Sequence, residues 1–146
     1  MIAKRSKQKI VIDSNVFLYV LLDQEPFSAH AKTLLKTIES SSSLEGVFSV
    51  LAFTEVLGEK ASKQSLIGHQ LLQELLNIRP APVSEPIAKK AGRLRAQFPE
   101  LRSADAIHLA TAITLKSKLF ITNDTKLKKI AQNLIPTKYL YDTVEL

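Results

Sequence analysis

The segment KIVIDSN (residues 9–15) places a β-branched apolar run directly before an acidic and polar break. An apolar run without polar alternation is typical of a short strand that is buried on both faces, as in parallel sheets. Asp13 ends this run, and Ser14 or Asn15 is a suitable N-cap for a helix over residues 16–22. The segment therefore predicts a buried strand that passes at once into a helix, with a carboxylate at the junction.

Alternating short apolar runs and longer amphipathic segments continue outward along the chain. The pattern predicts further strands over residues 46–50, 118–122 and 138–141, an extended segment over 79–83, and helices over 28–39, 53–57, 66–76, 85–97, 104–116 and 126–131. Strands that alternate with helices indicate an α/β fold with a mainly parallel sheet between two layers of helices. In such sheets, ligands bind outside the carboxyl ends of the strands.

The bulk composition favours one soluble domain with an anionic partner. The chain has 146 residues, no cysteine, a net charge of +6 and a pI near 9.6. We expect a single domain over residues 1–146, with a basic tail at 1–8 that is either solvated or touches RNA. The lack of cysteine excludes disulfides and thiolate metal sites, and a basic balance favours nucleic acid or another anionic partner. We see no secretory signal and no apolar run of the ~20 residues that span a bilayer, so we expect a cytoplasmic protein.

Four acidic residues from distant segments are predicted to meet at the carboxyl edge of the sheet. Asp13 and Asp124 directly follow predicted strands, and Glu55 and Asp105 lie near the starts of predicted helices. Clustered carboxylates repel one another unless cations lie between them. Oxygen ligands without cysteine suit Mg²⁺ or Mn²⁺ better than Zn²⁺, and the corresponding chemistry is phosphodiester hydrolysis.

Each acid also has a purely structural interpretation. Asp13 can cap a helix, Glu55 and Asp105 can complement a helix dipole, and Asp124 can belong to an Asn-Asp turn. A haloacid-dehalogenase-type hydrolase also has an aspartate after its first strand, but its second aspartate would stand where this chain has Asn15. A response-regulator receiver needs paired acids after the first strand and a phospho-acceptor after the third, and neither arrangement is present.

Four motifs in order resemble those of the PIN-domain nucleases. They are VIDSNV (11–16), TEV (54–56), SADAIHLATA (103–112) and ITND (121–124). The resemblance extends over about residues 9–142 and is most similar in size and layout to the VapC toxins of toxin–antitoxin pairs. It implies an α/β/α sandwich, a Mg²⁺- or Mn²⁺-dependent RNA endonuclease, frequent dimerisation, and metal-site roles for four residues. These are Asp13, Glu55, Asp105 and Asp124.

Several other residues are candidates for supporting roles. Asn15 matches a polar position of the family motif, Thr122 and Asn123 can orient Asp124 or a bound water, and His108 lies one helical turn after Asp105. A basic cluster that either binds RNA phosphates or is a solvated face comprises Lys89, Lys90, Arg93, Arg95 and Arg102. Three tyrosines can stack on bases, although packing in the core is the favoured role for each of them: Tyr19, Tyr139 and Tyr141.

The functional hypothesis is an endoribonuclease toxin that forms a homodimer and is inhibited by a small antitoxin, whose arginine pairs with the acids. The alternatives are a housekeeping RNA-processing nuclease and a catalytically inactive RNA-binding module of the same fold. Leucines expected to lie mostly in the core, with part facing a partner, are Leu66, Leu71, Leu72, Leu75 and Leu76.

Overall fold

A parallel β-sheet forms the centre of the computed structural model, which describes residues 6–58, 62–143 and 146, with the backbone alone at 62–66. Within this part of the chain the sheet has five strands in the order β3-β2-β1-β4-β5, and all neighbours pair in parallel. The strands are β1 (Gln8–Ile12), β2 (Leu44–Ser49), β3 (Ile78–Ala81), β4 (Leu119–Ile121) and β5 (Thr137–Lys138). The predicted parallel α/β sheet is confirmed.

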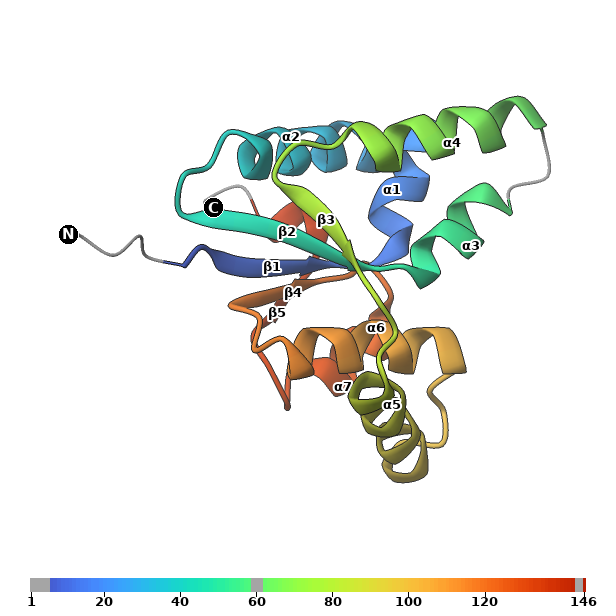
Figure 1. The fold of residues 1–146 in the computed structure, drawn as a ribbon, viewed down its shortest axis with the longest axis vertical. Helices are drawn as coiled ribbons and strands as arrows, with labels where there is room; N and C mark the ends of the chain where they lie inside the picture. Colours follow the sequence, from blue (N-terminus) through green and yellow to red (C-terminus); the bar gives the residue numbers. More distant parts are fainter. Residues whose placement is uncertain (1–5, 59–61, 144–145) are drawn as a thin grey trace.

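Helices cover both faces of this sheet (Figure 1). One layer consists of α1 (Ser14–Leu21), α2 (Phe27–Glu39), α3 (Leu51–Leu57) and α4 (Ser62–Glu74). The other layer consists of α5 (Glu85–Gln97), α6 (Ser103–Thr114) and α7 (Thr125–Ala131), and a short 3-10 helix, η1 (Leu140–Asp142), follows β5. The predicted three-layer α/β/α sandwich is therefore confirmed. Among the described residues, none of the helices has the length and apolar character that a membrane span requires.

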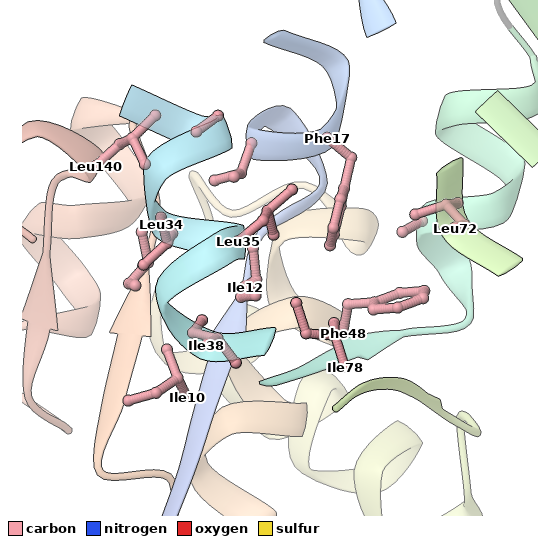
Figure 2. Close-up of a cluster of buried hydrophobic side chains, with 14 of the residues drawn as sticks. Ile10, Ile12, Phe17, Leu34, Leu35, Ile38, Phe48, Leu72, Ile78 and Leu140 are labelled. Atoms are coloured by element: carbon pink, nitrogen blue, oxygen red, sulfur yellow. The ribbon is translucent and has the colours of Figure 1, made fainter. Parts of the chain in front are cut away.

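The central strand β1 contributes to both hydrophobic cores. Ile10 and Ile12 pack into the cluster beneath α1 and α2, whereas Val11 packs into the cluster beneath α5 and α6. Figure 2 shows the first of these clusters, in which Phe17 and Phe48 meet edge to face with ring centroids 5.0 Å apart. Because a slip of one residue would exchange the two faces of β1, this packing fixes Asp13 at the carboxyl end of the strand.

Two segments at the edges of the sheet differ from the sequence-based expectation. Residues 78–81 form the edge strand β3, which tolerates Pro80 because an edge strand leaves one row of N–H groups without a ladder partner. The predicted last strand over 138–141 is wrong beyond Lys138, because the chain turns there into η1. The backbone N–H of Leu140 donates to Oδ1 of Asn123 over 2.8 Å, and its side chain is buried in the core.

The helix expected over 66–76 begins earlier, at Ser62, and ends at Glu74. The leucines of its stripe are core residues in part: Leu72 is buried and Leu71 and Leu75 pack against the core, but Leu76 is 69% exposed. The side chain of Leu66 lies outside the described residues, as do residues 1–5 of the expected tail.

Candidate active site

The four predicted acids all lie at the carboxyl edge of the sheet. Asp13 follows β1 and Asp124 follows β4, its direct neighbour in the sheet. Glu55 lies on α3, which begins two residues after β2, and Asp105 lies in the first turn of α6. Intervening residues connect the acids as two pairs. Ser14 and His108 lie between Asp13 and Glu55, and Arg102 lies between Asp105 and Asp124.

Asp13 is buried, and hydrogen bonds hold both of its carboxylate oxygens. Oδ1 accepts from the backbone N–H of Ser14 at 2.8 Å, so Asp13 itself is the N-cap of α1, in place of the expected Ser14 or Asn15. Oδ2 accepts from the Thr122 hydroxyl at 2.7 Å. Burial raises the pKa of Asp13, and this effect outweighs the lowering by His108 and by the two hydrogen bonds. The capping role and a site role are therefore compatible in one residue.

Glu55 is joined to the Asp13 region through Ser14 and His108. The Ser14 hydroxyl donates to Oε2 of Glu55 at 2.8 Å, and Nε2 of His108 lies 2.6 Å from Oε1. Burial alone would raise the pKa of Glu55, but the hydrogen bond and charge of His108 and the Ser14 bond lower it overall. Since an ionised carboxylate only accepts, the proton in the short bond belongs to His108 Nε2, which also lies 3.8 Å from Oδ1 of Asp13.

Arg102 connects the other pair. Its Nε atom donates to Oδ2 of Asp105 at 3.1 Å, and Nη2 lies 3.9 Å from Oδ2 of Asp124. The hydrogen bond and charge of Asp105 raise the pKa of Arg102, with a smaller contribution from Asp124. Oδ1 of Asp124 accepts from the backbone N–H of Leu127 at 2.9 Å and caps α7. Arg102 also occupies the N-cap position of α6 expected for Ser103.

An open cleft of about 500 Å³ lies beside this second pair. Arg102, Asp105, Asp124 and Lys126 are among the residues that line it. A charged ligand can therefore reach Asp105 and Asp124 directly, whereas Asp13 is almost fully covered.

The donor chemistry of the four acids suits a hard divalent cation, because all candidate ligands are carboxylate oxygens. The side-chain positions are less closely gathered: among the described residues, no three Asp, Glu or His side chains form a group arranged to hold a metal ion. Instead, the His108 ring lies near Asp13 and Glu55, and the Arg102 guanidinium lies near Asp105 and Asp124. Arg102 therefore supplies positive charge beside Asp105 and Asp124, and the His108 ring supplies a hydrogen-bond donor beside Glu55.

Of the supporting residues, Thr122 contacts Asp124 as expected, whereas Asn123 does not. Thr122 donates to Asp13 and accepts from the backbone N–H of Asp124 at 3.1 Å, so it links two acids. Asn123 binds the backbone of Leu140 rather than Asp124. The buried Oδ1 atom of Asn15 has no hydrogen-bond partner among the described residues.

Most of the predicted basic cluster lies on α5, away from the acids. Lys89 pairs with Glu85 of its own helix at 2.7 Å, and Arg93 is exposed. The Nε atom of Arg95 donates to the backbone carbonyl of Leu101 at 3.4 Å. Lys90 is half-buried on the same helix. Arg102 is the member that contacts the acids.

Several contacts of the site were not predicted from the sequence, among them those of Ser14 and Arg102. The Ser14 hydroxyl was expected to be a helix cap, but it binds Glu55. The sequence allows Arg102 either to bind RNA or to belong to a solvated face, and in the structure it pairs with Asp105, three residues later in the first turn of α6. That spacing of three is the signal that points to the pair, because such residues lie on one helix face.

Comparison with solved structures gives a consistent set of similar folds. A DNA-bound VapBC structure from Salmonella typhimurium has a TM-score of 0.68 at 12% identity, covering 91% of this chain and 98% of that chain. The Mycobacterium tuberculosis toxin VapC20, described as cleaving the sarcin-ricin loop, has a TM-score of 0.68 at 11% identity, covering 82% and 93%. A toxin–antitoxin complex from Klebsiella pneumoniae has a TM-score of 0.61 at 26% identity, covering 80% and 88%.

Sequence comparison identifies the family. No curated protein matches the chain. The model of the PIN domain family matches residues 10–133. This range contains all four acids, most of β1 and the whole of β2, β3 and β4. This chain belongs to the PIN domain family.

Proposed function

We propose that this chain is a single-domain, divalent-metal-dependent endoribonuclease and the toxin of a toxin–antitoxin pair. The observation that carries the proposal is the placement of four acids, from four separate segments, along one sheet edge of a PIN domain. These acids lie in a chain whose net charge is +6. An anionic substrate is attracted to the basic chain, and cations bound to the carboxylates would offset their repulsion of its phosphates.

Asp13, Glu55, Asp105 and Asp124 would hold Mg²⁺ or Mn²⁺. When bound, the ion supplies a water of lowered pKa and stabilises charge on the phosphate. The chain positions the carboxylates: Ser14 N–H and Thr122 orient Asp13, and Ser14 Oγ and His108 orient Glu55.

We expect the Arg102 side chain to change its partners when a divalent ion binds. This side chain is 79% exposed, so little packing holds it against Asp105 and Asp124. Asp105 and Asp124 would hold a divalent ion in place of the guanidinium. Arg102 would then be free to bind an RNA phosphate, as guanidinium groups commonly do.

Cleavage of a labelled single-stranded RNA tests this proposal. We expect cleavage with Mg²⁺ or Mn²⁺, no cleavage in EDTA, and none by the Asp105→Asn protein. Cleavage that persists in EDTA would contradict metal dependence. RNA binding without cleavage under any metal would favour the inactive RNA-binding module.

The contact between Arg102 and two acids supports the proposed mode of inhibition. A guanidinium already lies 3.1 Å from Asp105 and 3.9 Å from Asp124, so an arginine from an antitoxin peptide can pair with the same oxygens. The similar Klebsiella pneumoniae structure is described as a toxin–antitoxin complex. We propose a cytoplasmic homodimer bound by such a partner.

Co-expression with the product of the adjacent gene, followed by size-exclusion chromatography with light scattering, tests the partner and the dimer. We expect a stable complex without RNase activity, and slowed growth when the chain is expressed alone. An active nuclease that binds no such partner and leaves growth unchanged would favour the housekeeping RNA-processing nuclease.

A further inference from the structure

Two tyrosines beside the candidate active site form a stacked pair on the surface. The rings of Tyr139 and Tyr141 have centroids 5.3 Å apart and an interplanar angle of 14°. The ammonium of Lys128 lies over the Tyr139 ring, 4.6 Å from its centroid. The Tyr139 ring thus contacts both an ammonium and a second aromatic ring. The outer face of Tyr141, a residue that is 50% exposed, is left uncovered by this pair.

The tyrosine pair lies at the same sheet edge as the acids. In the β4–β5 pairing Ile121 is opposite Lys138, so Tyr139 is level with Thr122. The next residue, Leu140, donates its N–H to Asn123, the neighbour of Asp124. Lys128 is four residues after Asp124 on α7, about one helical turn or roughly 6 Å along the axis. The stack therefore lies at the same sheet edge as Asp124, which is one of the residues that line the cleft.

The backbone between the two rings is held in place. Leu140 is 1% exposed, and it anchors the η1 turn in the core. Tyr139 and Tyr141 flank this anchor, so their rings are presented on a fixed turn. Binding on such a surface does not require a loop to become ordered first, which lowers its entropic cost.

Tyr19 shows how a packing tyrosine differs in the same chain. It stacks on Phe27 with centroids 4.8 Å apart, and it packs against the core cluster. Tyr141, by contrast, is half exposed although aromatic rings strongly favour burial. The charges nearby are of both signs: α7 presents exposed Lys126 and Lys129 in addition to Lys128, and the exposed Asp142 follows Tyr141.

We propose that the outer face of Tyr141, supported by Tyr139 and Lys128, is a stacking site for one unpaired base of single-stranded RNA. The α7 lysines bind the neighbouring phosphates, and the nucleotide beyond them enters the cleft at Asp124. Aromatic platforms with adjacent positive charge bind single strands with little sequence preference, because every base has a π-face. This proposal rests on the proposed function, since it names the substrate contact of the same nuclease.

Equilibrium binding of a short fluorescent RNA to the full chain in EDTA tests the stacking site, with the RNA recovered intact on a gel. A stacked base contributes ~1–3 kcal/mol, so we expect Tyr141→Leu to weaken binding about 5- to 150-fold. Tyr141→Phe keeps the ring and should retain the affinity. Leu134→Ala, at another exposed apolar residue, is the control for loss of apolar surface and should also bind as the wild type does.

Abasic substitution separates stacking from a structural effect of the mutation. Each nucleotide of the RNA is replaced in turn by an abasic one. We expect one position to weaken binding to the wild type, and the same position to have no effect on Tyr141→Leu. Equal abasic losses in both proteins, unchanged affinity of Tyr141→Leu, or a wild type that does not bind single-stranded RNA would each overturn the proposal. The proposal would also be overturned if Tyr141→Leu weakened the binding of a protein partner and left the binding of RNA unchanged.

Binding and cleavage can fail independently in this design. A wild type that binds through Tyr141 but never cleaves with metal keeps the stacking site and contradicts the nuclease. A wild type that cleaves, with Tyr141→Leu binding equally well, keeps the nuclease and contradicts the stacking site.

Discussion

The Nε2 atom of His108 donates to Oε1 of Glu55 over 2.6 Å, in a position where the histidine side chain is 1% exposed. Burial alone would lower the pKa of His108. The hydrogen bond to Glu55 and the charges of Asp13 and Glu55 outweigh burial and raise the pKa above its ordinary value of 6.5. The folded chain therefore binds this proton more tightly than the unfolded chain does.

This difference predicts a pH-dependent stability. The contribution of His108 is fully present below pH 6.5 and is lost as the pH rises through the raised pKa of the folded state. The pKa of Glu55 is lowered, so its contribution is present above 4.5 and is lost only in acid. We expect the free energy of unfolding of the metal-free protein to fall as the pH rises above 6.5, and His108→Gln to flatten this fall.

Urea unfolding in EDTA, followed by circular dichroism between about pH 5.5 and pH 8.5, measures the effect. His69→Gln, at an exposed histidine, is the matched control and should keep the wild-type profile. If the His108→Gln protein also keeps the wild-type pH profile of stability, His108 is not the source of the pH dependence.

Removing the charge of one acid should abolish cleavage and leave the fold intact. Asp105→Asn keeps the shape of the side chain and loses a partly exposed ion pair with Arg102, so we expect a stability change within about 1 kcal/mol. Asp13→Asn lowers the burial cost of the charge but replaces one of two acceptor oxygens with a donor, so a moderate loss of stability is expected. Asp23→Asn, at an exposed acid in the loop after α1, should cleave normally. Normal cleavage by folded Asp13→Asn or Asp105→Asn protein would remove these residues from the site.

The competition between Arg102 and a divalent ion predicts tighter metal binding when the guanidinium is removed. An exposed ion pair contributes up to ~1 kcal/mol, so Arg102→Gln should raise Mn²⁺ affinity by about two- to fivefold in a calorimetric titration. Lys126→Gln removes an equal charge from the same cleft, at a residue with no ion pair among those found in the described chain. Equal effects of the two substitutions would show that net charge alone, rather than the Arg102 contacts, controls metal binding.

The exposed arginines of α5 should contribute to RNA binding through charge alone. Arg95 and Ser103 line a groove between α5 and α6, and α6 carries Asp105. Neutralising Arg93 and Arg95 together should weaken RNA binding and reduce the slope of log affinity against log salt by about 1.4, or 0.7 per lost contact. Lys32→Gln with Lys36→Gln, on α2 in the opposite helical layer, is the charge-matched control. A slope that changes equally in both double variants would place the RNA path elsewhere.

Local signals account for much of what was predicted correctly. The apolar run before Asp13, and Ser84 with Glu85 and Pro86 at the start of α5, each specify an element boundary over a few neighbouring residues. The Ser84 hydroxyl accepts from the backbone N–H of Ile87, as the pattern indicates. The end of β5 was mispredicted because it depends on Asn123, 17 residues away from Leu140, a contact that no local pattern contains.

The sequence by itself determined which carboxylates reach the edge of the sheet, because a strand end and a helix start are local events and the parallel order brings them to one side. Only the tertiary structure decided how their charges are offset. His108 lies near Asp13 and Glu55, and Arg102 near Asp124, because the packing of α6 against the sheet sets where those side chains reach. Contacts of this kind depend on the distances between elements that are remote in the chain, and residue types and their spacing do not contain those distances.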